Sequence, residues 1–244
     1  MREATLPLLA LHEVVKHYRG TAEAVRAVDG VSLTLGEGEM IALHGPSGSG
    51  KTTLLLLIAA LLAPDSGEIR FAGERLADMS ERRAAEYLRR DVGFIHQGSQ
   101  LMPYVSALEN ASVKLLIDGV DARAARRRAA PWLRRLGLGE RAQHTPEQLS
   151  AGERQCVAIA RALAGEPALI LADEPTGNLD STRSLQTVTL LGQIAREHGR
   201  SVVLVTHDSD AAALADRVYN LRDGRLLDSL PTPPSEPTDS YLLS

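Results

Sequence analysis

Short apolar runs separated by turn residues dominate the first seventy residues and predict strands. We expect them at Leu9–Val15, Val25–Leu35 and Met40–His44, with a turn of glycine and glutamate before the third. A nearly continuous apolar run at Thr53–Leu62 predicts a helix that is buried on most sides. The chain would then return as a strand at Glu68–Ala72.

The pattern changes to helical spacing between residues 79 and 164, where arginine and alanine are frequent. Helices are expected over Met79–Arg90 and within residues 106–136. Seven arginines between Arg123 and Arg141 form a charge run. We interpret this run as the solvated face of a helix, with binding to anionic lipid or nucleic acid as the alternative.

Alternation of strands and helices resumes in the last third of the chain. Ala168–Ala172 and Ser201–Thr206 are β-rich apolar runs, typical of strands inside a parallel sheet covered on both faces. Ser181–His198 is expected to be a helix between them, and Arg222–Arg225 a tight hairpin turn. Beyond Ser229 the chain carries four prolines with serine, threonine and aspartate, which predicts a disordered tail over 229–244.

Composition narrows the class of protein. The chain has 244 residues, a net charge of -4 and 24% charged residues, which suits one globular domain and excludes disordered, collagen-like and coiled-coil proteins. The near-neutral charge argues against a polyanion-binding protein. The longest apolar stretch, Leu54–Ala63, is half the ~20 residues that a membrane-spanning helix needs. The start of the chain lacks a signal pattern and the single Cys156 fits a reducing compartment, so we expect a cytoplasmic protein.

A glycine-rich segment follows the third expected strand and fits the pattern G-x-x-x-x-G-K-[ST]. Its glycines allow successive backbone N–H groups to point at a phosphate, and the following helix adds the positive end of its dipole. Lys51 would bridge the β- and γ-phosphates, and the Thr52 hydroxyl would bind Mg²⁺. The residues expected to bind ATP here are Gly45, Pro46, Ser47, Gly48, Ser49, Gly50, Lys51, Thr52 and Thr53.

An acidic pair supplies the second chemical element. Asp173 and Glu174 follow the buried run that ends at Ala172, at the end of a strand where open parallel sheets bind ligands. The Asp173 carboxylate can bind the hydrated Mg²⁺. Glu174 can polarise a water for attack on the γ-phosphate.

These residues resemble those of the ATP-binding-cassette (ABC) ATPases, and further motifs in family order extend the resemblance over residues 9–228. Leu149–Glu153 is similar to the family's signature sequence, and Pro175–Asp180 to its D-loop. His207 matches the switch histidine and Gln97 the Q-loop glutamine. Tyr18 lies where the family has an aromatic residue on the adenine ring.

The resemblance implies an α/β fold: a P-loop NTPase (RecA-like) core with an antiparallel β-subdomain and an inserted α-helical subdomain of about residues 98–164, together forming one domain over 1–228. It also implies two ATP molecules between two chains in a head-to-tail dimer. Ser150, Gly152 and Glu153 would then contact the ATP bound by the partner. By the same resemblance the catalytic residues are Glu174, His207, Gln97 and Lys51, and the metal ligands are Thr52, Gln97 and Asp173.

The chain departs from the family pattern in three places. Ala151 replaces the first glycine of the signature, and Cys156 stands where the family usually has arginine. His96, Gly98 and Ser99 replace the more usual aromatic residues around Gln97. None of these changes removes a catalytic atom, so we expect them to affect the turnover rate or the fit to a membrane partner.

The function that this resemblance implies is an ATP-hydrolysing motor subunit of an ABC transporter, with ATP and Mg²⁺ as cofactors. Its expected partners are a second ABC ATPase subunit, as a homodimer, and a separately encoded transmembrane permease that would place it on the inner face of the cell membrane; no nucleic acid is expected. Leu101, Met102 and Tyr104 would either form a docking groove for the permease or pack into the helical subdomain.

The sequences of these motifs are most similar to those of the subgroup that serves lipoprotein release, macrolide efflux and cell division. Two alternative functions remain at this point. A soluble ABC ATPase acting on nucleic acid or ribosomes would usually carry a coiled-coil insertion or a second cassette, and this chain has neither. A P-loop kinase would have no use for the signature, the D-loop or His207.

Overall fold

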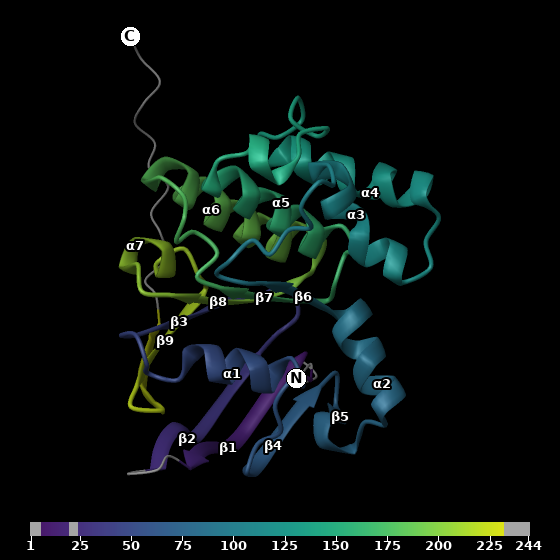
Figure 1. The fold of residues 1–244 in the computed structure, drawn as a ribbon. Coiled ribbons are helices and arrows are strands. Elements are labelled where there is room, and N and C mark those ends of the chain that lie inside the picture. The colour runs from purple at the N-terminus through teal and green to yellow at the C-terminus, as the bar shows by residue number, and fades with distance from the viewer. Residues whose placement is uncertain (1–5, 20–23, 232–244) are drawn as a thin grey trace.

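The structure is a computed structural model and describes residues 6–19 and 24–231. A six-stranded sheet has the order β10-β9-β3-β8-β7-β6 (Figure 1). Strands β3, β8, β7 and β6 are parallel, β9 is parallel to β3, and β10 is antiparallel to β9. Its strands are β3 (Met40–His44), β6 (Val92–Ile95), β7 (Leu169–Asp173), β8 (Ser201–Thr206), β9 (Arg217–Arg222) and β10 (Arg225–Pro231).

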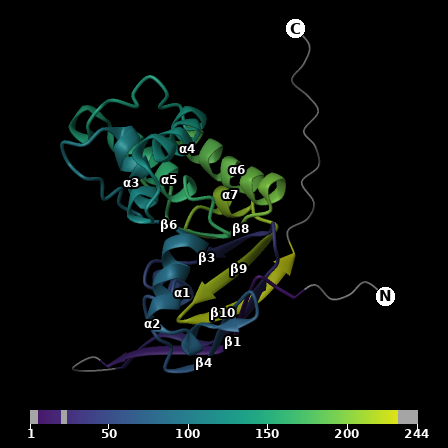
Figure 2. The same ribbon diagram turned by 90° about the vertical axis from the view of Figure 1, so that its right-hand side faces the viewer.

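A second, antiparallel sheet has the order β2-β1-β4-β5. The two views in Figures 1 and 2 show it on one side of the parallel sheet, with helix α1 (Lys51–Ile58) between them. The strands of this sheet are β1 (Leu9–Arg19), β2 (Ala24–Leu35), β4 (Ser66–Phe71) and β5 (Glu74–Arg75).

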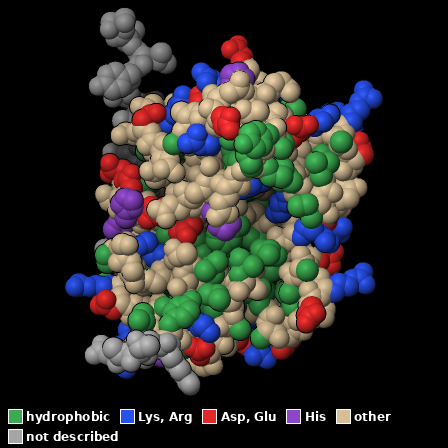
Figure 3. Space-filling view, viewed as in Figure 1, with side chains coloured by type: hydrophobic (Ala, Val, Ile, Leu, Met, Phe, Trp, Pro, Cys, Tyr) green, Lys and Arg blue, Asp and Glu red, His purple; other side chains and the backbone are tan. Residues whose placement is uncertain are grey.

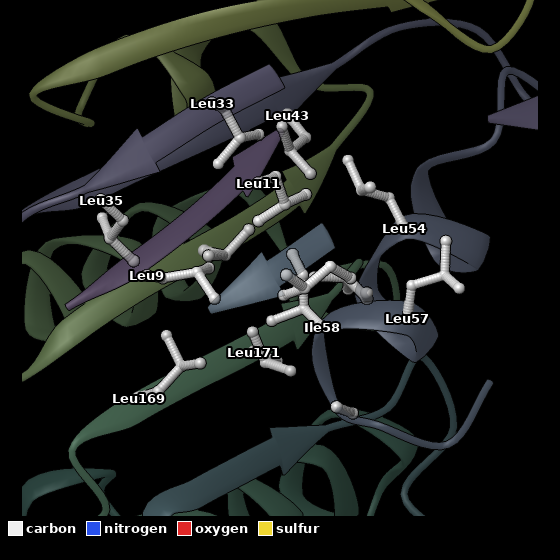
Figure 4. Close-up of a cluster of buried hydrophobic side chains, with 14 of the residues drawn as sticks. Leu9, Leu11, Leu33, Leu35, Leu43, Leu54, Leu57, Ile58, Leu169 and Leu171 are labelled. Carbon is white, nitrogen blue, oxygen red and sulfur yellow. The ribbon is translucent and has the colours of Figure 1, made fainter. Parts of the chain in front are cut away.

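The core between the two sheets is built from leucine-rich faces of every layer (Figure 4). Leu9 and Leu33 come from the antiparallel sheet, Leu43 and Leu171 from the parallel sheet, and Leu54 from α1. Leu54 and Leu171 are fully buried. Removal of this much apolar surface from water fixes α1 against the sheet, and with α1 the position of the glycine-rich loop before it.

Helices cover the opposite face of the parallel sheet (Figure 2). A cluster of buried side chains joins this face to α5 and α6, and a separate cluster joins α3, α4 and α5. The helices are α3 (Ala107–Ile117), α4 (Ala122–Arg135), α5 (Ala151–Leu163), α6 (Ser181–His198) and α7 (Ser209–Ala212); α2 (Glu81–Glu86) continues into a π-helical turn, η2 (Tyr87–Asp91). Two short 3-10 turns are η1 (Leu76–Asp78) and η3 (Pro146–Gln148).

Several predicted elements are confirmed to the residue. Strands β3 and β8 and helix α6 have the expected bounds. The hairpin turn also forms as expected, since Arg222 pairs with Arg225 across Asp223 and Gly224, which both have positive φ. Such a turn matches the twist of the two strands that it joins.

Other boundaries were wrong. Helix α1 begins two residues before Thr53 and ends at Ile58 rather than Leu62, because Ala60 takes a left-handed conformation (φ 56) that ends it. The stretch expected to be helical contains strand β6, which is short and whose glycine, Gly93, gave no β signal. Strand β10 reaches Pro231 and so includes residues 229–231 of the predicted tail, whose remaining part lies outside the described residues.

The arginine run is confirmed as an exposed face. Six of its members lie on α4 or directly at its end, where the buried positions are Ala125, Ala129 and Leu133. The spacing of these three residues is that of one helix face, so the arginines point to solvent. In the part of the chain that the structure describes, we find no helix with the length and hydropathy needed to cross a bilayer.

Candidate active site

A cleft of about 630 Å³ opens where α1 begins, beside the carboxyl ends of β7 and β8. Parallel sheets of this kind bind ligands at that edge. The cleft brings together eleven of the predicted site residues: Tyr18, Ser47, Gly48, Gly50, Lys51, Thr52, Thr53, Gln97, Asp173, Glu174 and His207.

The glycine-rich loop takes a conformation that other residues would not adopt. Gly48 and Gly50 have φ values of 80° and 102°. A Cβ atom on Gly50 would lie 1.8 Å from the carbonyl oxygen of Ala27, so this position also lacks room for a side chain. The loop therefore needs glycine both for its backbone and for its close approach to β2.

The Lys51 amine is buried and bonded only to backbone. Lys51 is 7% exposed, and its Nζ donates to the carbonyl oxygens of Gly45 (2.7 Å) and Pro46 (2.8 Å). Burial lowers the pKa of Lys51. Among the described residues the amine forms no ion pair, and an amine in this setting fits an anionic ligand such as a polyphosphate.

Thr52 and Asp173 place hard oxygen atoms at the edge of the cleft. The Thr52 hydroxyl donates to Oδ2 of Asp173 over 2.9 Å. Asp173 is 7% exposed, and burial raises the pKa of its carboxyl. A hydroxyl and a carboxylate next to a phosphate-binding loop are typical oxygen ligands of Mg²⁺. A bound divalent cation would also offset the free-energy cost of burying the charged carboxylate.

Glu174 and His207 are in direct contact. Nδ1 of His207 lies 2.9 Å from Oε2 of Glu174. Glu174 has a positive φ of 45°, and its backbone N–H donates to the carbonyl of Val205 over 3.0 Å. This link to β8 turns the Glu174 side chain into the cleft, where it is 13% exposed while that of His207 is 69% exposed. The pair therefore has the arrangement of a general base and the group that orients it.

Gln97 and Tyr18 lie at the rim of the cleft. The carbonyl of Gln97 accepts from Nδ2 of Asn178, which joins the loop after β6 to the loop after β7. Tyr18 is 41% exposed and pairs in register with Val25 across β1 and β2. An exposed aromatic ring at the mouth of a phosphate-binding cleft fits a base-stacking role.

Sequence reasoning missed Val25, Ala27 and Val205, which also line the cleft. Val25 is 58% exposed and extends the apolar surface of Tyr18. The predicted strand Val25–Leu35 contained it, but nothing local indicates which strand pairs with β1. Only that pairing brings Val25 to the cleft.

Gly45, Pro46 and Ser49 belong to the loop without lining the cleft. The first two contribute the carbonyls that accept from Lys51. Ser49 is 4% exposed, and its Oγ has no hydrogen-bond partner among the described residues.

The signature residues (Ser150, Gly152 and Glu153) lie at the start of α5 and do not line this cleft. Ser150 Oγ accepts from the Glu153 N–H over 3.2 Å, and Glu153 Oε2 accepts from the Ser150 N–H over 2.8 Å. This capping box, together with an ion pair to Arg141 (3.2 Å), lowers the pKa of Glu153. Gly152 packs against the D-loop, where an added Cβ would meet Leu179 at 3.0 Å.

Comparison with known proteins decides the family. The profile of the family described as "ABC transporter" matches residues 28–177. The chain belongs to the ABC transporter family. The "Lipoprotein-releasing system ATP-binding protein LolD" of Shewanella denitrificans is 43% identical to it over 229 residues, which are 94% of this chain and 98% of that protein.

Two further relatives extend the likeness. The "Macrolide export ATP-binding/permease protein MacB" of Hyphomonas neptunium is 43% identical over 91% of this chain and 34% of its own length. The solved dimer of the ATP-binding cassette MJ0796 in a post-hydrolysis state, bound to ADP and Pi, has a TM-score of 0.86 and 36% identity, covering 92% of this chain and 99% of that one.

The chain is therefore an ATPase, the motor of an ABC transporter, with the P-loop α/β fold that its sequence predicted. The expected likeness to the lipoprotein-release and macrolide-efflux subgroup is confirmed by LolD and MacB. The relatives named here are transporter subunits, which gives no support to the soluble ABC ATPase or the P-loop kinase.

Proposed function

We propose that two copies of this chain bind two ATP molecules head to tail and that each completed site hydrolyses one of them. One observation carries this proposal: the signature residues do not line their own chain's cleft. A second copy would bring its Ser150 and the first N–H groups of α5 to the phosphates on Lys51, where a helix N-terminus stabilises negative charge. The solved MJ0796 cassette is a dimer, which supports this arrangement.

Within one cleft we assign the roles by contact. Lys51 would bind phosphate oxygens in place of the carbonyls that it now contacts. Thr52, Asp173 and Gln97 would hold Mg²⁺, which supplies charge neutralisation at the phosphates when it is bound. Glu174 would accept a proton from the attacking water, and His207 would orient Glu174 through their 2.9 Å contact. Tyr18 would stack on the adenine.

The proposed domain is residues 1–228, with a helical subdomain of about 98–164 between β6 and β7. Its membrane subunit would be a separate polypeptide on the inner face of the membrane. The names of the two relatives support that part: LolD is the ATP-binding protein of a lipoprotein-releasing system, whereas MacB is an ATP-binding and permease protein in one chain. Lipoprotein release by such a system is the function that the LolD likeness favours.

We propose a neighbouring groove as the docking surface for the membrane subunit. Tyr104 is 81% exposed, Met102 is 39% exposed and Leu101 packs on the helical cluster, and none of the three lines the groove that Gln100 helps to line. The groove beside them is lined by Leu61, Leu88, Phe94, Val113 and Ile117. We place the contact with the membrane subunit there, since Ile117 and Leu61 expose 69% and 47% of their surface.

Light scattering on Glu174→Gln tests the dimer. The amide cannot accept the proton from water but leaves both phosphate contacts in place, so ATP should accumulate in a closed pair. We expect the mass to double with ATP and to stay monomeric with ADP. As a matched control, Glu174→Gln combined with Ser150→Arg should stay monomeric with ATP. A doubled mass in that control, or a monomer with ATP in the parent variant, would refute the proposal.

A further inference from the structure

Figure 3 shows the docking groove as a hollow between the helical part of the molecule and α1, with hydrophobic side chains on both sides of it. A second pocket, of about 520 Å³, shares no lining residue with that groove or with the catalytic cleft. It lies where the end of α4 meets α5 and α6, and its volume is within the range of sites that bind small molecules. We call it the arginine pocket. Its polar lining consists of Arg134, Arg135, Arg183, Gln186, Thr187 and Gln193.

Three guanidinium groups line the arginine pocket, and none of the described residues that line it is acidic. Arg134 and Arg135 lie in the last turn of α4, and Arg183 lies in the first turn of α6. In the described part of the chain neither Arg134 nor Arg135 pairs with a carboxylate. Arg183 reaches Asp180 only at 3.7 Å, and 49% of its side-chain surface stays exposed. Like charges around one pocket repel each other, so this lining favours an anion.

Contacts with a ring and with backbone hold two of these arginines in place. The Arg135 guanidinium lies over the Trp132 ring, 5.4 Å from its centre. The stem of Arg134 lies against Gly139, where an added Cβ would meet Arg134 Cγ at 3.0 Å. Neither contact uses a guanidinium N–H group as a hydrogen-bond donor, so these donors remain available to a ligand.

The buried end of the arginine pocket is uncharged. Cys156 on α5 and Thr187 on α6 are each 4% exposed, and Leu136 and Leu190 add apolar surface. Burial raises the pKa of the Cys156 thiol to about 11, so the thiol is neutral at pH 7 and does not repel an anion. The short cysteine side chain also leaves space that a longer one at this position would fill.

We propose that the arginine pocket binds a phosphate monoester, whose phosphate oxygens accept from Arg134, Arg135 and Arg183 and whose organic part lies at the uncharged end. A phosphate monoester carries a charge of about −1.5 to −2 at pH 7 and three strong acceptor oxygens. These match three guanidinium groups better than the single charge and two oxygens of a carboxylate. Because none of the described lining residues is a histidine or a carboxylate, the pocket has no general base and is a binding site.

A ligand held in this way would connect two parts of the molecule. The buried residues of α4 belong to the cluster that joins α3, α4 and α5, whereas those of α6 belong to the cluster on the parallel sheet. Trp132 and Leu136 contact both clusters. A phosphate bound by Arg134 and Arg183 would therefore bridge the two clusters, and its binding should stabilise the folded chain by mass action.

Isothermal titration calorimetry with glycerol 3-phosphate tests the site on the full chain, with ADP and Mg²⁺ in both solutions to occupy the catalytic cleft. We expect the wild type to bind with a dissociation constant below about 1 mM. Arg134→Gln and Arg183→Gln should each weaken binding at least tenfold, because each removes a charged donor from a different helix. Arg127→Gln is the matched control and should bind like the wild type, since Arg127 is an exposed arginine on α4 outside the pocket.

The same four chains are then mixed with phosphatidylcholine vesicles that contain or lack phosphatidic acid, whose headgroup is also a phosphate monoester. Binding of glycerol 3-phosphate would identify a soluble ligand. Binding only to vesicles that contain phosphatidic acid, with the same pattern among the variants, would identify a lipid.

Binding of neither ligand, equal binding by all four chains, or a loss in only one of the two pocket variants would overturn the inference. The proposed function would stand in each case, because none of these arginines lines the catalytic cleft or belongs to the signature.

Discussion

The catalytic cleft and the groove each contain a lysine whose amine donates to backbone carbonyl groups, and this lysine is buried in the cleft and partly buried in the groove. Lys51 donates to Gly45 and Pro46, and Lys114 donates to Val92. The cleft also holds Asp173 and Glu174, whereas no acidic residue lines the groove. In our proposals the cleft binds the phosphates of ATP and the groove binds the membrane subunit, and only the cleft carries acidic groups placed to hold a metal ion and to activate water. This difference fits the two proposed roles, ATP hydrolysis in the cleft and binding of a partner in the groove.

Removing the amine of the cleft should have the largest effect. Lys51→Met keeps the length of the side chain but cannot bind phosphate, so we expect ATP hydrolysis to fall about 100-fold or more. A steady-state phosphate-release assay measures it. Lys16→Met is the matched control, because Lys16 pairs with Asp65 (2.9 Å) outside the cleft. Hydrolysis above a tenth of the wild-type rate in Lys51→Met would contradict the assigned role.

Loss of the group that orients Glu174 should have a smaller effect. In His207→Ala the carboxylate keeps its position after β7 but loses its 2.9 Å contact, so kcat should fall about 10- to 100-fold with little change in KM. The control is His12→Ala, an exposed histidine on β1. If KM rises and kcat does not fall, His207 contributes to binding ATP rather than to the chemical step.

Lys114→Met should stabilise the chain in the absence of its partner. The folded chain lowers the pKa of Lys114 from 10.5 to about 8, so between these values the unfolded chain binds a proton that the folded chain does not. Stability of the wild type therefore rises with pH across this window. At pH 7 the variant should be more stable than the wild type by about 1–2 kcal/mol, a figure that allows for the loss of the hydrogen bond to Val92. The difference in stability should be smaller near pH 10.

Urea unfolding of the wild type and Lys114→Met at pH 7 and at pH 10 measures the difference in their free energy of unfolding. Lys114→Arg keeps the charge and should gain no stability at pH 7. A Lys114→Met variant that is less stable than the wild type at pH 7 would mean that the amine has a counter-charge in the free chain, and the contrast between the two lysines would fail.

A substitution in the signature sequence, Ala151→Gly, should have the smallest effect of the four on the protein. Ala151 is the first residue of α5 and is exposed, so its methyl group would face the partner's ATP in the proposed dimer. We expect Ala151→Gly to raise the hydrolysis rate about twofold by easing closure, although glycine costs about 1 kcal/mol in a helix interior. An unchanged or lower rate would show that the methyl group does not hinder closure.

Local patterns predicted much of the fold. The strands β3 and β8 are continuous apolar runs between clear turn signals. Helix α6 begins directly after Asp180, whose side chain accepts from the Arg183 N–H (2.9 Å), and it ends before Gly199, which has a left-handed conformation. Strand β6 was missed because four residues with a central glycine carry little β signal. It exists because Val92–Ile95 pairs with β7.

The candidate site was predictable where a motif is contiguous in the sequence. The glycine-rich loop and Asp173-Glu174 are of that kind. The capping box of Ser150 and Glu153 follows the S-x-x-E pattern and could have been found. The role of Val25 could not be predicted, because Val25 reaches the cleft only through its pairing with Tyr18. The positive charge of the groove could not be predicted either, because Lys114 and Arg161 come from helices far apart in the chain.

The central claim, that each site needs two chains, is tested most directly by mixing two inactive variants. Lys51→Met lacks a working phosphate loop but keeps its signature, and Ser150→Arg lacks the signature but keeps its loop. In a head-to-tail pair of one of each, one site combines the two intact halves. We predict that each variant alone is inactive and that an equal mixture recovers about a quarter of wild-type ATP hydrolysis, since half the pairs are mixed and each has one working site. A mixture as inactive as its components would contradict the account.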